Sequence, residues 1–382
     1  MATTPNSNDD VAAAIAELPL VDHHCHSFFS SPLTDQLIED NLTESPDARA
    51  ARTSTFDSNL GLATLRFVGT NLFGLEAPVT REAYLEARRP LTPSELVTRS
   101  LTAAGVSDLL VDTGYHATEL FSTTELATLT TARVHEILRI ETTAEALLNE
   151  LQSPEEFLDA WPNLLARLDP TVVGLKSIAA YRSGLALSGE SASRSEVAFA
   201  LGHELRHQPT RISDPMVIGY LVRSAIDITR LPVQFHIGLG DPDVRLATGR
   251  PGHLQSLIEF ANQHNTAITL LHCYPYHREA ALLAHDYPNV YLDLGLALNF
   301  VGPRATEVLT ETLELAPYAK VLYSSDAYGL PELNYLGAIQ FRTALTQHLT
   351  QLVDQRYLST SGALRLAALM SHETAKDLYQ LS

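Results

Sequence analysis

Residues 18–26 read LPLVDHHCH, a short apolar run that ends in a carboxylate, a thiol and three imidazoles. A short apolar run bounded by polar residues is typical of a buried strand in a parallel sheet. Alternate side chains of an extended strand share a face, so we expect His24 and His26 to point the same way, together with Asp22. The residues expected on the opposite face are His23 and Cys25.

Two imidazoles on one face at the end of a strand can bind one divalent metal ion. Asp22 is then expected to orient a ligand ring from behind, while His23 either packs or supports the site from a second layer. A His-x-His pair also occurs as a purely structural pair. The choice between these interpretations depends on the rest of the chain.

The length and charge of the chain narrow the possible functions. It has 382 residues, is 45% hydrophobic and can bury the core of a (β/α)8 barrel with insertions. A formal charge of −19 disfavours nucleic acids and anionic membranes as partners, because both attract basic surfaces. Its apolar runs are shorter than the roughly 18 residues that a membrane helix needs.

The N-terminal stretch MATTPNSNDD lacks the basic flank and apolar core of a secretory signal. We expect residues 1–10 to form a disordered tail and residues 11–382 to form the barrel. Cys25 and Cys273 cannot build a disulfide framework, which favours a reducing, cytoplasmic environment.

Residues 28–100 read as mostly helical and separate the first predicted strand from the next. An ordinary connection in such a fold has about 2 to 6 residues. We therefore expect a helical cap, inserted after strand one, that packs beside whatever His24 and His26 bind. An insertion remote from the site is the alternative.

From residue 105 onward, apolar stretches that predict strands alternate with helical patterns. The predicted strands cover residues 105–115, 131–142, 171–184, 231–241, 267–276, 289–299 and 319–329. Together with the first strand they make eight strand-helix units. This alternation predicts an α/β fold in which a parallel sheet closes into a (β/α)8 TIM barrel.

Polar residues interrupt the apolar runs near the C-terminal ends of predicted strands one, four, five, six and eight. Those after strand one are Lys176, His236, His272 and Asp326. In a barrel these ends converge on one mouth, where such folds place their chemistry. A buried polar group without a partner costs about 1 to 3 kcal/mol, so a functional site explains the pattern better than chance does.

The pattern D-x-H-x-H at residues 22–26, with a His after strands five and six and an Asp after strand eight, resembles the amidohydrolase superfamily of metal-dependent (β/α)8 hydrolases. The stretches GLKSIAAYRSGL, QFHIGLGDPD, LLHCYPYHREAALLAHDYPNVYLDLGLA and YSSDAYGLPELNYLGA are similar to a narrower group. That group is the amidohydrolase-type domain fused to a glutamine-synthetase-like domain in plant nodulin-type and related fungal proteins. The resemblance runs from about residue 18 to the C-terminus, and we expect a free-standing version here.

This resemblance implies that His24, His26 and His236 are metal ligands and that Asp326 is a further ligand and proton acceptor. Such ligands suit Zn2+ or another divalent metal such as Mn2+. His272 would polarise the scissile carbonyl, alone or bound to a second metal; a core histidine is the alternative. The implied reaction is hydrolysis of the C–N bond of a small amide by metal-activated water, with γ-glutamyl-type amides as the leading substrate class.

Lys176 has three open roles. In some members of the superfamily a strand-four lysine is carbamylated and bridges two metals, so the site would bind one or two ions. An unmodified Lys176 would instead neutralise a substrate carboxylate or pair with Glu141.

Arg182 is expected to bind a substrate carboxylate, because a guanidinium group can donate two parallel hydrogen bonds to the two carboxylate oxygens. A surface arginine is the alternative. Arg139 and Glu141 are expected in the mouth, either as a structural ion pair or as part of the substrate-binding surface. The other residues expected to line the pocket are Tyr274, Tyr328, Asp241 and Glu332.

Residues 202–209, GHELRHQP, place His203, Glu204 and His207 as H-E-x-x-H, the helical spacing of zinc proteases. The longer metzincin continuation is missing, and Pro209 ends the helix soon afterwards. We expect a solvated helix face here, with a zinc protease as a remote alternative.

Two further functions stay open. A decarboxylase of the same superfamily would hold a carboxylate substrate with the same ligands and release CO2. A non-catalytic, metal-stabilised scaffold would keep its function when Asp326 is replaced. A homo-oligomer is expected only because the family that the sequence resembles commonly forms homo-oligomers.

Overall fold

Seven parallel strands form one curled sheet in the order β1-β2-β3-β4-β5-β6-β7. The computed structural model describes residues 7–115, 118–151, 153–190, 192–207 and 211–382. The strands are β1 (Leu20–Cys25), β2 (Val106–Asp112), β3 (Arg133–Arg139), β4 (Val172–Ser177), β5 (Val233–His236), β6 (Ile268–Leu271) and β7 (Val290–Leu292). Sequence neighbours are also sheet neighbours, which confirms the predicted α/β class and the parallel, barrel-like sheet.

The eighth predicted strand is an extended segment, not a regular strand, and it lies between β7 and β1. The amide of Leu322 donates to the Leu292 carbonyl of β7 at 2.9 Å. On the other side, the amide of Asp326 donates to the carbonyl of His24 at 3.1 Å. These bonds tie the segment to both ends of the sheet and place Asp326 beside the histidines of β1.

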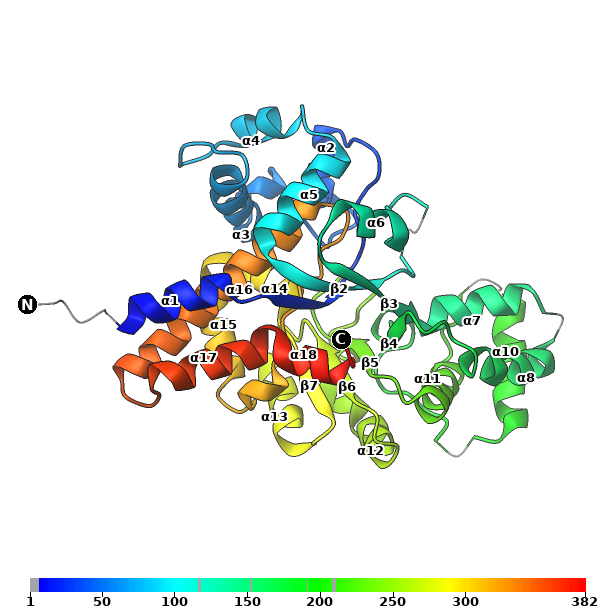
Figure 1. Cartoon of the computed structure of the whole chain (residues 1–382). Helices are drawn as coiled ribbons and strands as arrows, with labels where there is room; N and C mark the ends of the chain where they lie inside the picture. Colours follow the sequence, from blue (N-terminus) through cyan, green and yellow to red (C-terminus); the bar gives the residue numbers. More distant parts are fainter. Residues whose placement is uncertain (1–6, 116–117, 152, 191, 208–210) are drawn as a thin grey trace, which may run out of the picture.

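Helices follow the strands and cover the outside of the sheet (Figure 1). The helices are α1 (Ser7–Glu17), α2 (Asp35–Asp40), α3 (Asn59–Ala63), α4 (Arg81–Arg88), α5 (Pro93–Ala104), α6 (Thr123–Leu129), α7 (Ile140–Asn149), α8 (Pro154–Leu165), α9 (Ala179–Arg182), α10 (Arg194–His207), α11 (Pro215–Thr229), α12 (Gln255–Gln263), α13 (His277–Asp286), α14 (Gly295–Val301), α15 (Ala305–Thr312), α16 (Pro331–Asp354), α17 (Thr360–Ala368) and α18 (Thr374–Leu378). Helix α1 begins inside the range predicted as a tail, and residues 1–6 lie outside the described part. Within the described ranges, no helix combines the length and the apolar character needed to cross a membrane.

Helix α5 shows how the local sequence sets the ends of a helix. The side chain of Thr92 caps the amide of Glu95, and the Glu95 carboxylate returns to the amide of Thr92, a capping box. Pro93 occupies the first turn, where its missing N–H costs nothing. Gly105 ends the helix in a left-handed conformation with φ 63°, which glycine adopts without strain.

Three predicted strands are shorter than the sequence suggested. Helix α7 begins directly after β3, so Glu141 lies in a helix. Residues 178–184 leave β4, and Arg182 ends the short helix α9. The apolar run 289–299 divides into β7 and α14. Short apolar runs do not distinguish a buried strand from a buried helix, which explains these boundary errors.

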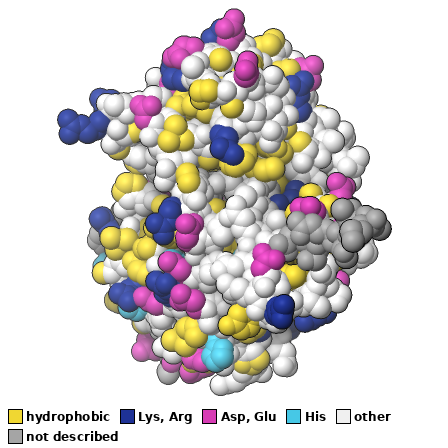
Figure 2. All heavy atoms as spheres, turned by 90° about the vertical axis from the view of Figure 1, so that its left-hand side faces the viewer, with side chains coloured by type: hydrophobic (Ala, Val, Ile, Leu, Met, Phe, Trp, Pro, Cys, Tyr) yellow, Lys and Arg dark blue, Asp and Glu magenta, His cyan; other side chains and the backbone are white. Residues whose placement is uncertain are grey.

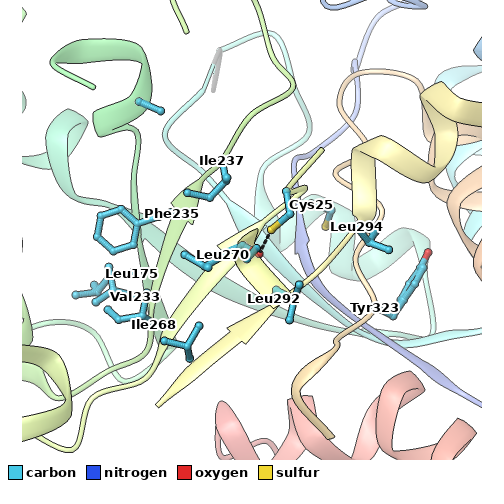
Figure 3. Close-up of a cluster of buried hydrophobic side chains, with 14 of the residues drawn as sticks. Cys25, Leu175, Val233, Phe235, Ile237, Ile268, Leu270, Leu292, Leu294 and Tyr323 are labelled. Carbon is cyan, nitrogen blue, oxygen red and sulfur yellow. Dashed lines mark hydrogen bonds between the residues drawn. The ribbon is translucent and has the colours of Figure 1, made fainter. Parts of the chain in front are cut away.

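The main hydrophobic core lies between the sheet and the surrounding helices. Figure 3 shows part of it, including Leu175, Val233, Phe235, Ile268, Leu270, Leu292 and Tyr323. These side chains come from β4, β5, β6, β7 and the eighth segment. Cys25 and Cys273 are buried and unbridged in the same core.

The C-terminal residues fill the inside of the sheet below the mouth. Tyr379, just after α18, packs with Val21, Leu110, Ile137 and Leu322 in a small buried cluster. Its hydroxyl also contacts polar residues beneath the histidines, as described below. The last residues of the chain therefore support the site from inside the sheet.

The insertion at residues 28–100 has a small core of its own. Its buried members are Ile38, Leu42, Phe56, Leu60, Ala63, Leu65, Val68, Leu72, Tyr84, Leu85, Leu330, Tyr335 and Leu336. The last three lie at or near the start of α16, the helix that follows Asp326. This shared core fixes the insertion to the segment that carries Asp326.

A buried ion pair adds to this attachment. Arg88 at the end of α4 donates to Glu332 in the first turn of α16, and their side chains are 7% and 1% exposed. The expectation that Glu332 lines the pocket is therefore wrong, because its carboxylate is used inside the protein.

Charged side chains are interspersed on the outer surface. On the face shown in Figure 2, Lys and Arg side chains occur next to Asp and Glu, with hydrophobic side chains between them. The excess negative charge of the chain does not gather into a single patch among the described residues of this face.

Candidate active site

His24 and His26 meet Asp326 where β1 and the eighth segment end. Nε2 of His24 lies 3.1 Å from Oδ1 of Asp326, and Nε2 of His26 lies 3.6 Å from the same oxygen. Their ligand atoms all lie within 4.8 Å of one another, a spacing suited to one metal ion. The structure thus brings together three of the predicted ligands from opposite ends of the chain.

Hydrogen bonds determine which ring nitrogen of His24 carries the proton and which one presents a lone pair to Asp326. Nε2 of Gln234 donates to the carbonyl of His23 at 2.7 Å and to the hydroxyl of Tyr379 at 2.9 Å. This orients Oε1 of Gln234 toward Nδ1 of His24, at 2.8 Å. Nδ1 therefore carries the proton, and Nε2 presents its lone pair to Asp326.

The Nδ1 atom of His26 is also the protonated ring nitrogen. The resulting arrangement of His24, His26 and Asp326 suits a bound cation. Nδ1 of His26 lies 3.3 Å from the carbonyl oxygen of Asp112, so Nδ1 donates and Nε2 has the lone pair. Oδ1 of Asp326 is buried and has no hydrogen-bond partner among the described residues. Two lone pairs and an unpaired carboxylate oxygen that face one another repel unless a positive ion lies between them. Imidazole and carboxylate ligands suit a divalent metal such as Zn2+.

Gln234 is expected to control metal affinity through this orientation. Replacing it with Met removes the acceptor for Nδ1–H of His24, and loss of such a supporting contact typically weakens metal binding by about 10 to 100-fold. Competition with a chromophoric chelator for Zn2+ measures the effect. Thr269→Val is the matched control, because Thr269 contacts the Tyr379 hydroxyl at 3.4 Å and no ligand histidine. Equal affinities in the two variants would contradict this role of Gln234.

His272 lies on the other side of Asp326. Its Nε2 is 3.3 Å from Oδ2 of Asp326, and its ring centroid is 4.9 Å from that of His236. The side chain is 1% exposed, yet neither ring nitrogen has a hydrogen-bond partner in the described part of the chain. Nδ1 and Nε2 of His272 are therefore available to a ligand.

The backbone at this end of the sheet adopts conformations that non-glycine residues rarely adopt. Asp326 has φ 49°, His272 has φ 67° and Cys273 has φ 56°. The amide of His272 is held by Oδ1 of Asp293 at 2.7 Å. Left-handed backbone at non-glycine residues costs about 1 to 3 kcal/mol and is concentrated at functional sites.

His236 lines the same cavity as His26 and Asp326, but its side chain contacts Tyr181. The hydroxyl of Tyr181 lies 3.1 Å from Nε2 of His236. His236 is not among the three residues whose ligand atoms lie within 4.8 Å. The structure places it beside His272, so its expected role as a ligand stays a proposal.

Lys176 is buried at the end of β4, with Nζ 3.3 Å from Nε2 of His24. Burial lowers the pKa of this lysine to about 8. The alternative in which Lys176 pairs with Glu141 is wrong: Glu141 accepts from the hydroxyl of Ser177 at 2.6 Å and from the amide of Ile178 at 3.1 Å.

The expected ion pair between Arg139 and Glu141 is also wrong. Arg139 donates to Asp112 at 2.6 Å, and both side chains are buried. Burial alone would raise the pKa of Asp112, but Arg139 and His26 hold that pKa well below its usual value. Glu141 was misplaced because the sequence did not reveal that a helix starts at residue 140.

Arg182 lies where it was predicted, but its guanidinium is already paired. Nη1 of Arg182 donates to Glu145 at 2.6 Å and to the carbonyl of Ile212 at 3.4 Å. Glu145 precedes it by a whole helix and strand, so the sequence did not indicate the pair. A substrate carboxylate would have to compete with Glu145 for this side chain.

A cavity of about 840 Å3 lies above these residues. Its lining includes His26, Lys176, His236, His272 and Asp326 at the inner end, together with Arg139 and Arg182. Tyr328 and Asp241 also line it, as expected. Tyr274 is not part of the lining; its ring stacks on His277 with a centroid distance of 5.6 Å.

Strand β1 departs from strict alternation. The pairing of β1 with β2 shifts register between Asp22 and Cys25, so consecutive side chains no longer face strictly opposite sides. Gln234 contacts both His23 and His24, and His23 also lies 2.8 Å from Oδ2 of Asp293.

Asp22 does not orient a ligand ring as expected. Its carboxylate accepts from the backbone amide of Ser325 at 2.9 Å and from the hydroxyl of Ser325 at 2.5 Å. It also accepts from the side-chain amide of Asn334 at 2.7 Å. It therefore fixes the eighth segment next to Asp326, and Gln234 orients His24 instead.

The H-E-x-x-H motif is part of helix α10, remote from this group. Glu204 is 8% exposed and accepts from the hydroxyl of Ser213 at 2.7 Å and from the amide of Asp214 at 2.8 Å. The expected solvated face holds for the exposed His203 but is wrong for Glu204. The side chain of His207 lies outside the described residues. The hydrogen bonds of Glu204 explain this carboxylate without a protease.

Sequence reasoning missed four residues of the site: Gln234, Asp293, Tyr181 and Glu44. The sequence contained a signal for Gln234 and Asp293, because each is a polar residue in an apolar run. Gln234 lies two residues before His236, and Asp293 lies just after β7. Tyr181 directly precedes Arg182 and gave no pattern. Glu44 lies in the insertion, where no motif distinguished it.

Comparison with known proteins agrees with this geometry. Residues 219–360 match the sequence model of the family described as Amidohydrolase. This match covers less than half of the chain and shows that its C-terminal part is similar to that family. A crystal structure from Lactobacillus casei, described as a "putative metal-dependent hydrolase", matches with a TM-score of 0.85 and 28% identity over 97% of each chain. The group formed by His24, His26 and Asp326 could hold a metal ion, in keeping with the similarity to that hydrolase.

More distant solved structures share the fold alone. Uronate isomerase of Thermotoga maritima has a TM-score of 0.61 and 14% identity over 98% of each chain.

Protein fluG of Emericella nidulans is 36% identical over 229 residues, which make up 56% of this chain and 26% of fluG. The chain thus spans about a quarter of the length of that relative.

Proposed function

We propose that this chain is a member of the amidohydrolase family and hydrolyses the C–N bond of a small amide at the group formed by His24, His26 and Asp326. The observation that carries the proposal is the convergence of two Nε2 lone pairs and an unpaired Asp326 oxygen at the inner end of an 840 Å3 cavity. A cavity of this size accommodates a small-molecule substrate. We propose His236 as a further ligand, supported by its place beside His272.

A divalent ion held there would polarise the substrate carbonyl and make a water molecule more acidic. The residues of the chain supply the proton transfers. Burial raises the pKa of Asp326 to about 6, partly opposed by His26 and Lys176. A carboxylate with this pKa accepts a proton from water near neutral pH and returns it to the leaving amine. The protonated ring nitrogen of the neutral His272 can donate to the carbonyl oxygen as negative charge develops on it.

Lys176 distinguishes a site with one ion from a site with two. A carbamylated Lys176 would bridge two ions, and carbamylation requires the neutral amine, which the lowered pKa favours. An unmodified Lys176 would keep a positive charge beside a single ion. The ratio of bound metal to protein, measured after dialysis with and without bicarbonate, distinguishes the two: a rise from one to two with bicarbonate supports the bridge.

The insertion at residues 28–100 is proposed to act as a cap over this site. Its residues Gln36, Asp40, Glu44 and Asp47 line the outer part of the cavity. Substrates would therefore enter beside the insertion, and its loops would help to determine which amides fit.

The leading substrate class is γ-glutamyl-type amides. Lys176, whose ammonium has no carboxylate partner among the described residues, would hold the glutamyl carboxylate more readily than Arg182. The test is amine release from a panel of γ-glutamyl amides by Zn2+-loaded protein. We expect activity that is lost in His24→Ala; no release above that variant for any amide would contradict the proposal.

A decarboxylase is the second candidate, and Lys176 is the observation that favours it. A buried ammonium beside the ligand histidines could hold a substrate carboxylate next to the ion. Release of CO2 without release of amine or ammonia would support decarboxylation. Release of amine without CO2 would support hydrolysis.

A further inference from the structure

The arginines that line the cavity are already paired with carboxylates of the protein. Arg139 pairs with Asp112 at 2.6 Å, Arg182 with Glu145 at 2.6 Å and Arg211 with Asp243 at 2.9 Å. Arg49 pairs with Asp47 at 2.8 Å. Every arginine of the described lining therefore has a carboxylate partner before any substrate binds.

Several carboxylates of the lining lack such a partner, among them Glu44 and Asp241. Glu44 forms neither a hydrogen bond nor an ion pair with a cationic side chain among the residues that the structure describes, although it lies partly buried in the insertion. Asp241 accepts the backbone amide of Asp243 at 2.8 Å, while the nearby Arg211 binds Asp243 instead. The cavity thus has acidic side chains without cationic partners.

The environment of Glu44 shows the consequence of this imbalance. Burial, followed by repulsion from Asp326 and from Asp241, raises the pKa of Glu44 to about 8. A cation bound nearby would remove this repulsion. Glu44 therefore lies close enough to both the inner and the outer acidic groups to sense a ligand that spans them.

Aromatic rings line the same part of the cavity. The rings of Tyr115 and Tyr328 lie 4.9 Å apart, and Phe29 lies 5.6 Å from Tyr328. Tyr115 is near the two carboxylates: after burial, Glu44 and Asp241 are the largest causes of its raised pKa. Aromatic faces next to carboxylates are a common environment for an alkylammonium group, because the ring quadrupole attracts a cation.

The inner end of the cavity independently indicates a ligand. His272 is 1% exposed and lines the cavity, and its two ring nitrogens have no hydrogen-bond partner in the described ranges. Buried polar atoms of this kind are normally satisfied, so a bound molecule accounts for them. Glu44 and Asp241 line the same cavity as His272.

We propose that the substrate carries a protonated amine in addition to its scissile amide, and that Glu44 and Asp241 bind this amine against the rings of Tyr115 and Tyr328. The inference rests on the proposed amide hydrolysis and narrows its substrate class to cationic amides. Glu44 and Asp241 are then specificity-determining residues.

The first test compares two amides of the same size. An N-(4-aminobutyl) amide and the N-pentyl amide of the same acid differ by a terminal ammonium in place of a methyl group. We expect the Zn2+-loaded protein to prefer the cationic amide by roughly tenfold or more in kcat/KM, and Glu44→Gln and Asp241→Asn each to reduce that preference. Glu86→Gln is the matched control, because Glu86 is an exposed residue of the same insertion outside the cavity lining. Equal kcat/KM for both amides would overturn the inference and leave amide hydrolysis intact.

The second test does not require turnover. Calorimetry with pentylamine and with 1-pentanol measures whether the metal-loaded protein binds an alkylammonium ion more tightly than its neutral counterpart. We expect roughly tenfold tighter binding of the amine, lost in the Glu44→Gln/Asp241→Asn double variant and kept in Glu86→Gln. This result without hydrolysis of any amide would support the cation site and contradict the proposed reaction. No preference for the amine would overturn the inference, provided that thermal unfolding shows the variants to be folded.

Discussion

Replacement of Asp326 by Asn is expected to lower kcat/KM for amide hydrolysis by about 10² to 10⁴-fold, the range for loss of a general acid-base group. Asn has nearly the same shape but cannot accept the proton of the attacking water. It also tolerates the left-handed backbone of this position, φ 49°, so the fold should be kept. Initial rates of amine release at saturating Zn2+ give the effect.

Two controls separate the proton-transfer role from metal binding and folding. Metal analysis of Asp326→Asn shows whether the loss remains when the ion is bound. Asp57→Asn makes the same chemical change at an exposed position of the insertion and is expected to leave the rate unchanged. A metal-loaded Asp326→Asn protein within about threefold of the unmodified rate would mean that another group takes the proton.

Replacement of Arg88 by Met is expected to reduce the free energy of unfolding by about 3 to 5 kcal/mol, because it leaves the Glu332 carboxylate buried and unpaired. The two side chains are 7% and 1% exposed and connect the insertion to α16. Urea unfolding monitored by circular dichroism measures the change. The Arg88→Met/Glu332→Met double variant should recover most of the loss, since replacing both charges with apolar groups removes the desolvation cost.

The neighbouring Arg89 provides a matched control. Its side chain is 63% exposed and pairs with Asp35 at 3.0 Å on the surface. Exposed pairs of this kind contribute about 0 to 1 kcal/mol, so Arg89→Met is expected to change stability little. Equal destabilisation by Arg88→Met and Arg89→Met would show that the buried pair does not fix the insertion.

The sequence predicted the fold class and the convergence of the site because both depend on regular patterns. The alternation of apolar runs and helical stretches indicated parallel strands, and parallel strands bring their C-terminal ends together. That is why His24, His26 and Asp326, 302 residues apart at the extremes of the site, were expected to meet. The eighth strand was placed correctly although its hydrogen bonding is irregular.

What the sequence did not predict depends on side-chain partners that no spacing rule connects. Arg182 pairs with Glu145, although it was expected to bind a substrate carboxylate. Arg139 pairs with Asp112, although a pair with Glu141 was expected. Gln234, which the sequence analysis did not single out, orients His24 in place of Asp22. Pairings of this kind require coordinates.

The H-E-x-x-H segment illustrates the opposite case, a motif without its chemistry. Its helical spacing is present in α10, but Glu204 binds Ser213 and Asp214 within the protein. A general base of a metalloprotease must face water instead. A motif alone therefore does not indicate function unless its environment agrees.

The most direct test of the metal centre is an anomalous difference map from a crystal grown with Zn2+ and measured at the zinc absorption edge. We predict a peak within about 2.0 to 2.2 Å of Nε2 of His24, Nε2 of His26 and a carboxylate oxygen of Asp326. A zinc peak only elsewhere, for example beside His203, with none at these three residues, would contradict the account.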